Sequence, residues 1–411
     1  MRARPVFAST CLLAVAVGVA ACGHKSVPDS ASTRTTLTIY SSQPLQGLAQ
    51  PQSESIVNAE KLALAEADGR IGRFTLKYVA LDDGTAAAGG PDPGQTSAAS
   101  RKAAQDSSTI AYLGEAAGGA STASLPILNE AGILQVSPTD TAAGLTRREG
   151  AAKGEPDKYY PSGNRTFVRV VPPDNVQAAA QASYQREQAC TSTFVVSDGG
   201  AFGRGLAAQF ALAAKAGSGP AVAKTVVFPP GSKDTAALAR QIGSSHADCA
   251  LLAVTTSSAP ASLLTAIHRA HPQVKLFGPS ELAQSSIAGQ LPSSVQRVTY
   301  LTSPALDPKL YPPAGQDFFS AYRDQFGKDA EPLAIFGYEA MKLTLLAIQN
   351  AGDRGSDQQS VIDAVFKIKD RDSPLGRYSI DGSGDTTLSD YGAYRVERGK
   401  LVFDKLIKPS P

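Results

Sequence analysis

One stretch, residues 109–141, does most to limit the folds open to this chain. Its apolar runs at 110–113 and 133–136 suit strands that are buried on both faces. A glycine-rich turn followed by a helical segment occupies 114–131 between them. Such a unit places free helix N–H groups and the polar turn 137–141 at the carboxyl edge of a parallel sheet. We therefore expect a ligand site at this edge.

The same alternation of apolar runs and helical segments fills most of the chain in two sets. In the first set, strands are expected at 36–40, 74–80, 110–113, 133–136 and 167–171, and helices at 53–67, 95–105 and 120–131. In the second set, strands are expected at 193–196, 221–228, 250–254, 275–277 and 295–301, and helices at 174–187, 204–215, 234–243 and 261–270. Later helices are expected at 316–326, 336–351 and 357–368, with a terminal hairpin at 391–396 and 401–407. This order predicts parallel sheets covered by helices.

Proline-containing breaks mark where the chain passes between the two sets, at Pro172-Pro173, Ser303-Pro304 and Ser373-Pro374. The predicted fold is therefore α/β, with two doubly wound parallel-sheet lobes joined by a three-crossover hinge. The expected lobes are 36–171 with 303–378, and 172–302 with 379–411. A hinge at such crossings can close two lobes on a ligand.

The start of the chain indicates export. Arg2 and Arg4 precede an apolar stretch that is short for a membrane-spanning helix, so 1–21 is expected to be a signal peptide. It runs into Cys22-Gly23 and resembles the bacterial lipobox, in which Cys22 would be diacylated and would anchor the chain to the membrane. An ordinary signal with an incidental cysteine is the alternative. Residues 22–35 are then a polar, flexible tether.

The charge balance indicates no nucleic-acid surface. Without Arg2 and Arg4, the 39 basic residues fall to 37, equal to the 37 acidic ones. The chain has no basic run with interleaved aromatic residues, which a nucleic-acid surface would need. No nucleic-acid partner is therefore expected.

Two of the four cysteines, Cys190 and Cys249, remain once Cys11 leaves with the signal and Cys22 carries lipid. In an exported chain they favour a disulfide. Each lies just before a predicted strand. If those strands are parallel neighbours, both sulfurs lie at the sheet edge away from the ligand. Two buried thiols are the alternative.

Four stretches, together with Tyr338-Glu339-Ala340, resemble the type I periplasmic binding proteins, specifically the branched-chain amino-acid-binding receptors of ABC transporters. The stretches are Gly114-Glu115 with 129–133, 136–141 with Leu145-Thr146, 197–206, and 277–281. The resemblance covers about residues 36–405. It implies two lobes with a ligand between them, no catalysis, no cofactor, and a lipid anchor that keeps the receptor near its permease. We expect a monomer.

The resemblance also points to ligand-binding residues in the first lobe. In this group, the ligand's α-carboxylate meets hydroxyl and backbone N–H groups at a turn, and further contacts follow a Ser-Pro pair. Carried onto this sequence, these positions are Ala117, Gly118, Gly119, Ser121, Asp140 and Thr141. Gly118 replaces the usual serine, and Asp140 stands where the group usually has a small residue. A turn aspartate that bonds its own backbone is the alternative for Asp140.

In the second lobe the corresponding positions are Phe202, Thr255, Thr256, Ser280 and Glu281. Phe202 replaces a family tyrosine that lies over the ligand, or is simply core. Ser280 replaces the acid that meets the ligand's ammonium group, and the neighbouring Glu281 is either a substitute or a solvated acid. Either Asp140 or Glu281 takes over the ammonium, or the ligand is not a standard amino acid. A buried carboxylate without a cation is costly, and a cationic or amine ligand would supply one.

Two alternatives to a transport receptor remain open on the sequence. A sensing protein of the same fold would feed a signalling partner, and neighbouring permease genes would separate the two. An extracytoplasmic hydrolase would need a nucleophile elbow, but no Gly-x-Ser-x-Gly occurs. His268 and His271 lie three apart on one helix without a third ligand nearby, so no metal site is expected.

Overall fold

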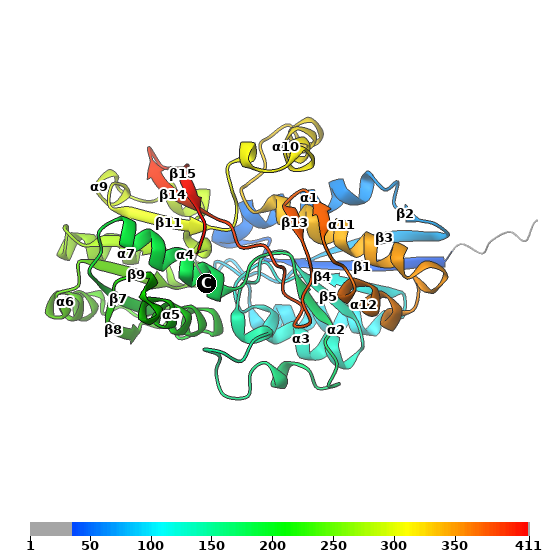
Figure 1. The fold of residues 1–411 in the computed structure, drawn as a ribbon, viewed down its shortest axis with the longest axis horizontal. Helices are drawn as coiled ribbons and strands as arrows, with labels where there is room; N and C mark the ends of the chain where they lie inside the picture. Colours follow the sequence, from blue (N-terminus) through cyan, green and yellow to red (C-terminus); the bar gives the residue numbers. More distant parts are fainter. Residues whose placement is uncertain (1–34, 410–411) are drawn as a thin grey trace, which may run out of the picture. The chain divides into compact units, whose positions relative to one another are not determined.

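The computed structural model describes residues 35–409. The predictions for the signal peptide, Cys22 and the tether up to residue 34 lie outside this range. The first sheet has six strands in the order β2-β3-β1-β4-β5-β6 (Figure 1). Their bounds are β1 (Thr35–Gln43), β2 (Arg70–Ile71), β3 (Phe74–Asp82), β4 (Thr109–Leu113), β5 (Leu134–Ser137) and β6 (Phe167–Arg169). All neighbours are parallel except the edge pair β2 and β3.

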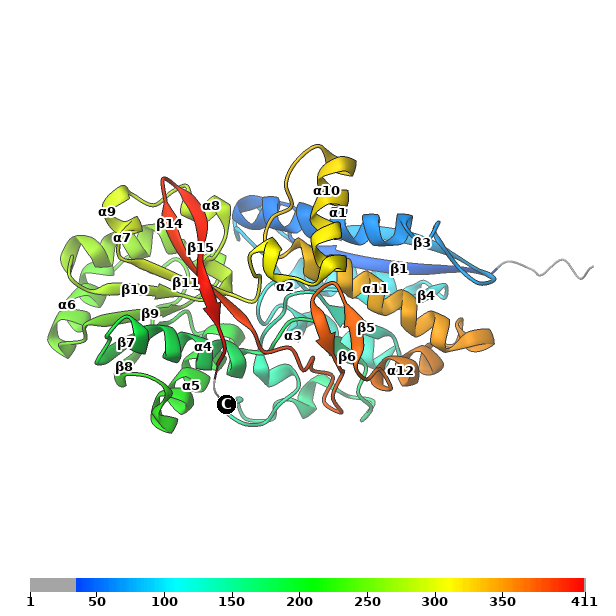
Figure 2. The same ribbon diagram turned by 45° about the horizontal axis from the view of Figure 1, so that its top comes forward.

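The second sheet has seven strands in the order β15-β14-β11-β10-β9-β7-β8. They are β7 (Ser192–Ser197), β8 (Ala221–Val227), β9 (Cys249–Ala253), β10 (Lys275–Gly278), β11 (Thr299–Ser303), β14 (Tyr391–Glu397) and β15 (Lys400–Ile407). Strands β7 to β11 run parallel, and β14 and β15 form an antiparallel hairpin beside β11 (Figure 2). The predicted terminal hairpin is confirmed. A separate small sheet pairs β12 (Arg371–Ser373) with β13 (Gly376–Tyr378).

The two large sheets share one topology. In each, the chain first adds a strand on one side and then moves to the other side, so the order reverses between β1 and β4 and between β7 and β9. Ligands of open α/β sheets bind beyond the carboxyl ends of the strands at such reversal points. The predicted pair of doubly wound parallel sheets is confirmed, and the loops after β4, β7 and β9 occupy these positions.

Helices cover both faces of the first sheet. We call the first sheet with its helices the first half of the molecule, and the second sheet with its helices the second half. The helices of the first half are α1 (Gln50–Ala65), α2 (Pro93–Gln105), α3 (Ser121–Glu130), α10 (Pro313–Phe326), α11 (Ala334–Asn350) and α12 (Gln358–Phe366). Alternation along β1 sends Leu37 and Ile39 into the core with α1, α11 and α12, while Tyr40 packs with residues of α2 and α3 on the other face. Helix α3 is followed by Gly132 in the left-handed region at φ +68°, as expected for a helix stop.

The second sheet is covered in the same way, by α4 (Asp174–Glu187) and α5 (Ala201–Ala213) on one face. The other face carries α6 (Thr235–Ser245), α7 (Pro260–Ala270), α8 (Ser285–Ala288) and α9 (Ser293–Gln296). Short 3-10 or π turns occupy Gly47–Ala49, Ala143–Leu145, Asp157–Tyr159, Ala214–Ser218, Thr256–Ser258, Ser280–Leu282, Pro308–Leu310 and Gly352–Arg354.

Several predicted element boundaries are shifted; for example, α5 begins at Ala201 and α10 at Pro313, each three residues earlier than expected. Two other shifts have a clear physical cause. The first helix begins at Gln50 and not at residue 53; Pro51 lies in its first turn, and Ser53 is buried inside the helix. Proline suits a first turn because its missing N–H would have had no helical partner. The strand expected from residue 295 begins at Thr299, because Val295 enters the core from the short helix α9.

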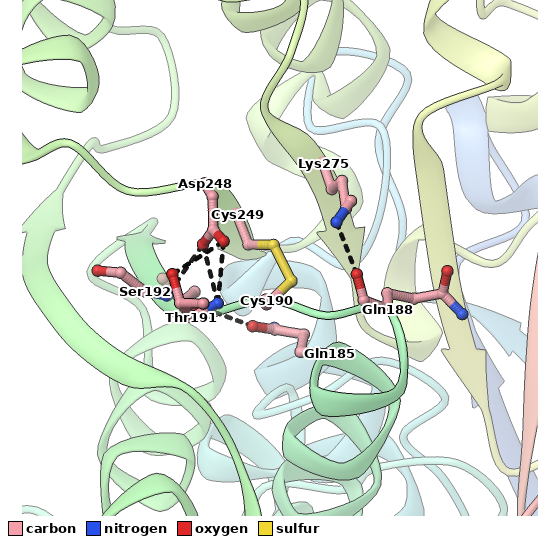
Figure 3. Close-up of a disulfide and its surroundings, with 9 residues drawn as sticks. Gln185, Gln188, Cys190, Thr191, Ser192, Asp248, Cys249 and Lys275 are labelled. Atoms are coloured by element: carbon pink, nitrogen blue, oxygen red, sulfur yellow. Dashed lines mark hydrogen bonds between the residues drawn. A yellow bond between two sulfur atoms is a disulfide. The ribbon is translucent and has the colours of Figure 1, made fainter.

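Cys190 and Cys249 form a disulfide, with their Cα atoms 5.9 Å apart (Figure 3). Strands β7 and β9 are parallel neighbours, and Thr193 lies opposite Cys249 at their amino ends. The bond therefore lies at the edge opposite the loops that follow these strands, as predicted. Beside it, the carboxylate of Asp248 accepts hydrogen bonds from the backbone N–H groups of Thr191 and Ser192, both at 2.9 Å (Figure 3).

Candidate functional site

Asp140, just after β5, is fully buried against the start of α3. One carboxylate oxygen, Oδ1, accepts hydrogen bonds from the N–H groups of Gly119 at 2.7 Å and Ala142 at 3.1 Å. The other, Oδ2, accepts from the N–H of Ser121 at 2.9 Å. The first N–H groups of a helix have no partner within the helix, so a carboxylate there is well placed. Asp140 thus uses the backbone donors of the predicted ligand-binding turn.

Another donor of that turn, the N–H of Gly118, is used by a residue of the second half. The N–H of Gly118 donates to Oε1 of Glu281 at 2.8 Å, and Glu281 itself is only 6% exposed. The ring of Phe202 lies against Gly118 so closely that a Cβ at position 118 would come 2.3 Å from ring atom Cδ2. Phe202 is buried and also belongs to a core cluster of the second half. The structure therefore brings together three stretches that the sequence singled out.

Asp198, which follows β7, organises the second-half loops. Its Oδ2 accepts hydrogen bonds from the N–H and the hydroxyl of Thr255, at 2.9 and 3.1 Å. Its Oδ1 accepts the N–H of Gly200 at 2.9 Å, and a Cβ on Gly203 would lie 2.3 Å from the same oxygen. Glycine at 203 is what lets α5 start this close to β9. The Thr255 hydroxyl is therefore engaged within the second half.

A polar chain that the sequence analysis did not identify links the two halves. The carbonyl of Thr141 accepts the N–H of Asp174 at 2.7 Å, and Oδ1 of Asp174 accepts from Nε2 of Gln177 at 2.8 Å. Oε1 of Gln177 in turn accepts the N–H of Ser280 at 2.8 Å. The Thr141 hydroxyl also lies toward the carboxylate of Asp174 and offsets part of the rise in its pKa. The only sequence feature that marked any residue of this chain of hydrogen bonds was the position of Asp174 at a helix start.

No ion pair formed by the described residues includes Asp140, Asp174, Asp198 or Glu281. Arg169 is fully buried and its charge acts on Asp140 and Asp174, but its guanidinium pairs with other groups. Its Nε pairs with Asp385 at 2.8 Å, and its Nη1 donates to the backbone carbonyls of Asp140 and Ala142, each at 2.9 Å. The carboxylates between the two halves therefore lack a dedicated cation.

Burial shifts these carboxyl groups toward their neutral forms. It raises the pKa of Asp140, although three N–H bonds and the charge of Arg169 offset part of the effect. Burial raises the pKa of Glu281 to about 7, where the bond from Gly118 lowers it and the charges of Asp140 and Asp198 raise it further. Burial likewise raises the pKa of Asp174 to about 8. A cation placed beside any of these carboxyl groups would stabilise its ionised form.

Two of the cavities where the halves meet are lined by candidate residues. One, of about 140 Å³, is lined in part by Gly118, Gly119 and Thr255. The other, of about 20 Å³, is lined in part by Ala117, Thr256, Ser280 and Glu281. A space of about 20 Å³ holds roughly one water molecule. The candidate residues thus surround little free volume in this arrangement, and Thr141 stands apart, beside Asp174.

Within residues 35–409, no three side chains of the metal-binding types gather where they could hold an ion. Nε2 of His271 lies 2.6 Å from the carbonyl of Ala239. Of the helices that the structure describes, none combines the length and apolar character needed to cross a bilayer.

Paired α/β sheets of one topology, with polar loops meeting at their reversal points, define the class of two-lobed solute-binding proteins. The family described as periplasmic binding protein matches residues 36–400, and the chain belongs to that family. This confirms the resemblance to type I periplasmic binding proteins stated from the sequence. The relatives are binding proteins and not enzymes, which agrees with the expectation that this chain catalyses no reaction.

Individual relatives support the same assignment. The Leu/Ile/Val-binding protein BraC3 of Rhizobium johnstonii is 25% identical over 372 residues, which cover 89% of this chain and 93% of BraC3. The fold is similar to a leucine-binding protein LivK from Thermotoga maritima, with a TM-score of 0.77, 20% identity and coverage of 91% and 99%. It is also similar to an ABC-transporter solute-binding protein from R. palustris in complex with benzoate, with a TM-score of 0.73, 17% identity and coverage of 91% and 97%.

Proposed function

We propose that this protein is an extracytoplasmic solute-binding protein that binds a small polar solute between its halves and presents it to an ABC permease. The observation that carries the proposal is the contact between loops of the two halves, in which Gly118 donates a hydrogen bond to Glu281 at 2.8 Å. The relatives bind leucine, isoleucine and valine, or benzoate, according to their names. These names favour a branched-chain amino acid or a related compound as the solute.

We assign lobe 1 to residues 36–171 and 303–378, and lobe 2 to 172–302 and 379–411. The chain then crosses between the lobes three times. Because the cavity beside Glu281 measures only about 20 Å³, a solute would enter when the lobes move apart at these crossings. The lobes would then close on it.

The N-terminal sequence supports attachment to the cell membrane. Removal of 1–21 would leave Cys22 as the lipidated first residue, and two acyl chains would hold the protein at the extracytoplasmic face. Residues up to 35 would be the tether. The proposed receptor acts as a monomer and binds no cofactor.

A thermal-shift screen tests this function on the full-length protein in detergent. The panel contains amino acids, amides, polyamines and aromatic acids. A ligand at about 100 times its dissociation constant raises the free energy of unfolding by about 2.7 kcal/mol. We expect at least one class to stabilise the protein. If no small solute does, the proposed function is wrong.

Asp140→Ala should weaken the binding of a hit by about tenfold, or about 1.4 kcal/mol, in calorimetry. Asp248→Ala, which changes an aspartate beside the disulfide, is the control and should leave the affinity unchanged. An unchanged affinity in Asp140→Ala would remove Asp140 from the site.

A further inference from the structure

The turn before α3 offers its backbone donors to side chains of this chain. The N–H groups of Gly118, Gly119 and Ser121 donate to the carboxylates of Glu281 and Asp140. Such N–H groups at a helix start are where a small anion would otherwise bind. Asp140 belongs to the same half as the turn, so its bonds to Gly119 and Ser121 do not depend on how the two halves meet.

Two carboxyl side chains therefore accept hydrogen bonds from the consecutive N–H groups of Gly118 and Gly119. A third carboxylate, Asp198, is close enough to raise the pKa of Glu281. The guanidinium of Arg169, whose charge acts on Asp140, is taken by Asp385 and by backbone carbonyls. Buried charges without a partner are costly, so this arrangement favours a positive group between the halves.

Asp174 adds a further buried carboxylate next to this turn. Its N–H donates to the carbonyl of Thr141, the residue after Asp140, and the Thr141 hydroxyl lies toward its carboxylate. The charge of Asp140 raises the pKa of Asp174, and no ion pair formed by the described residues includes either of them. Asp174 therefore strengthens the need for a positive group here.

Building on the proposed function, we propose that the solute is a cationic amine without a carboxylate, and that Asp140 sets this preference. Asp140 occupies the donors that a ligand carboxylate would need, and its charge repels such a group. The same charge, with that of Glu281, attracts an ammonium group, which donates hydrogen bonds to both carboxylates. Asp140 is thus a specificity-determining residue and acts as an internal substitute for the ligand's carboxylate.

Calorimetry with two matched pairs of probes tests this preference on the full-length protein. Isoamylamine is compared with leucine, which differs by its carboxylate, and benzylamine is compared with benzoate, which carries the opposite charge. We expect each amine to bind at least about tenfold more tightly than its carboxylate partner, a difference of about 1.4 kcal/mol. Leucine or benzoate binding as tightly as its amine partner would overturn the inference.

Variants assign the preference to its residue. Asp140→Asn removes the charge and leaves one backbone donor free, so the ratio of amine to carboxylate affinity should fall by at least about tenfold. Asp248→Asn makes the same chemical change beside the disulfide and should keep the wild-type ratio. If Asp140→Asn does not fold, Glu281→Gln, whose amide oxygen can still accept from Gly118, should lower amine affinity alone. An unchanged ratio in a folded Asp140→Asn protein would overturn the role of Asp140.

The outcomes also separate this inference from the proposed function. If a solute from the wider screen binds but neither amine does, the solute-binding function stands and the amine inference fails. If no small solute binds, both fail.

Discussion

Two aspartates, Asp140 and Asp248, make similar bonds at different places in the molecule. Asp140 accepts three backbone N–H groups at the start of α3, where the two halves meet. Asp248 accepts the N–H groups of Thr191 and Ser192 and the Thr191 hydroxyl, at the amino ends of β7 and β9. Hydrogen bonds of this kind favour the ionised carboxylate in both cases.

The pKa values nevertheless move in opposite directions. Asp140 is fully buried, and its burial raises its pKa more than its N–H bonds lower it. Asp248 is only partly buried, so the smaller effect of burial is outweighed by the bonds from Ser192 and Thr191, and its pKa is lowered. The extent of burial, and not the number of hydrogen-bond donors, therefore decides the direction of the pKa shift. Asp248 is stable as a carboxylate with its present partners, whereas Asp140 still needs a cation.

The largest expected effect is a loss of folding stability when the disulfide beside Asp248 is removed. The disulfide joins residues separated by 59 positions, so Cys190→Ala with Cys249→Ala should lower the free energy of unfolding by about 4 kcal/mol in the chain-entropy model. Urea denaturation measures this loss. Solute affinity should stay within about twofold of wild type, because the bond lies at the opposite edge of the sheet. If the double variant loses solute affinity but keeps its stability, the disulfide does not act only on stability, and the comparison between Asp248 and Asp140 fails.

The next effect is a pH dependence at the meeting of the halves, where Glu281 faces Asp140 and Asp198. Its folded-state pKa of about 7 lies above the ordinary value of 4.5. The folded state therefore holds the proton more tightly, and stability is lost as the pH rises from about 4.5 through about 7. Glu281→Gln should raise the free energy of unfolding at pH 8 by up to about 3 kcal/mol and change it little at pH 4.

Chemical denaturation at both pH values measures this difference. Asp248→Asn is the matched control and should not reduce the loss of stability between pH 5 and 8. The residual slope in Glu281→Gln should come from the other buried carboxyl groups with raised pKa values, among them Asp174, whose pKa is raised to about 8, and Glu60, whose pKa is raised to about 7. Equal stabilisation by Glu281→Gln at pH 4 and pH 8 would contradict a buried, titrating carboxylate.

The smallest effect is expected for Asp248→Asn at neutral pH. It should cost about 1 kcal/mol, because solvent screens a partly exposed carboxylate and only the charged character of its bonds is lost. Since the pKa of Asp248 is lowered, its contribution is present above the ordinary pKa and is lost as the pH falls through the folded value. The difference from wild type should therefore shrink near pH 2, as measured by acid-dependent thermal melts.

Local patterns were enough to predict much of the fold. Apolar runs bounded by glycine and proline marked the strands, and the positions of Cys190 and Cys249 before two of them predicted the disulfide. The pattern was wrong at Val295, because an apolar residue in a four-residue helix and one in a strand look the same in sequence.

The site was predictable only where it resembles a family. The resemblance located Gly118, Phe202 and Glu281, which the structure brings into contact. It did not reveal Arg169 with Asp385, because their bond joins residues 216 positions apart and no local pattern marks either one. Nor did any motif show that Asp140 would take up the backbone donors of the turn, since that depends on how the loop after β5 approaches α3.

The hairpin β14–β15 has a consequence for how the chain is made. Both strands follow the first sheet in the sequence, yet β14 pairs with β11, with partners that run from Tyr300 and Arg395 to Ser303 and Gly392, and extends the second sheet. A partly synthesised chain therefore presents β11 as an unpaired edge that can join other strands. Only a chain that has been made through β14 can cover that edge, so the second sheet should reach its final form after the first.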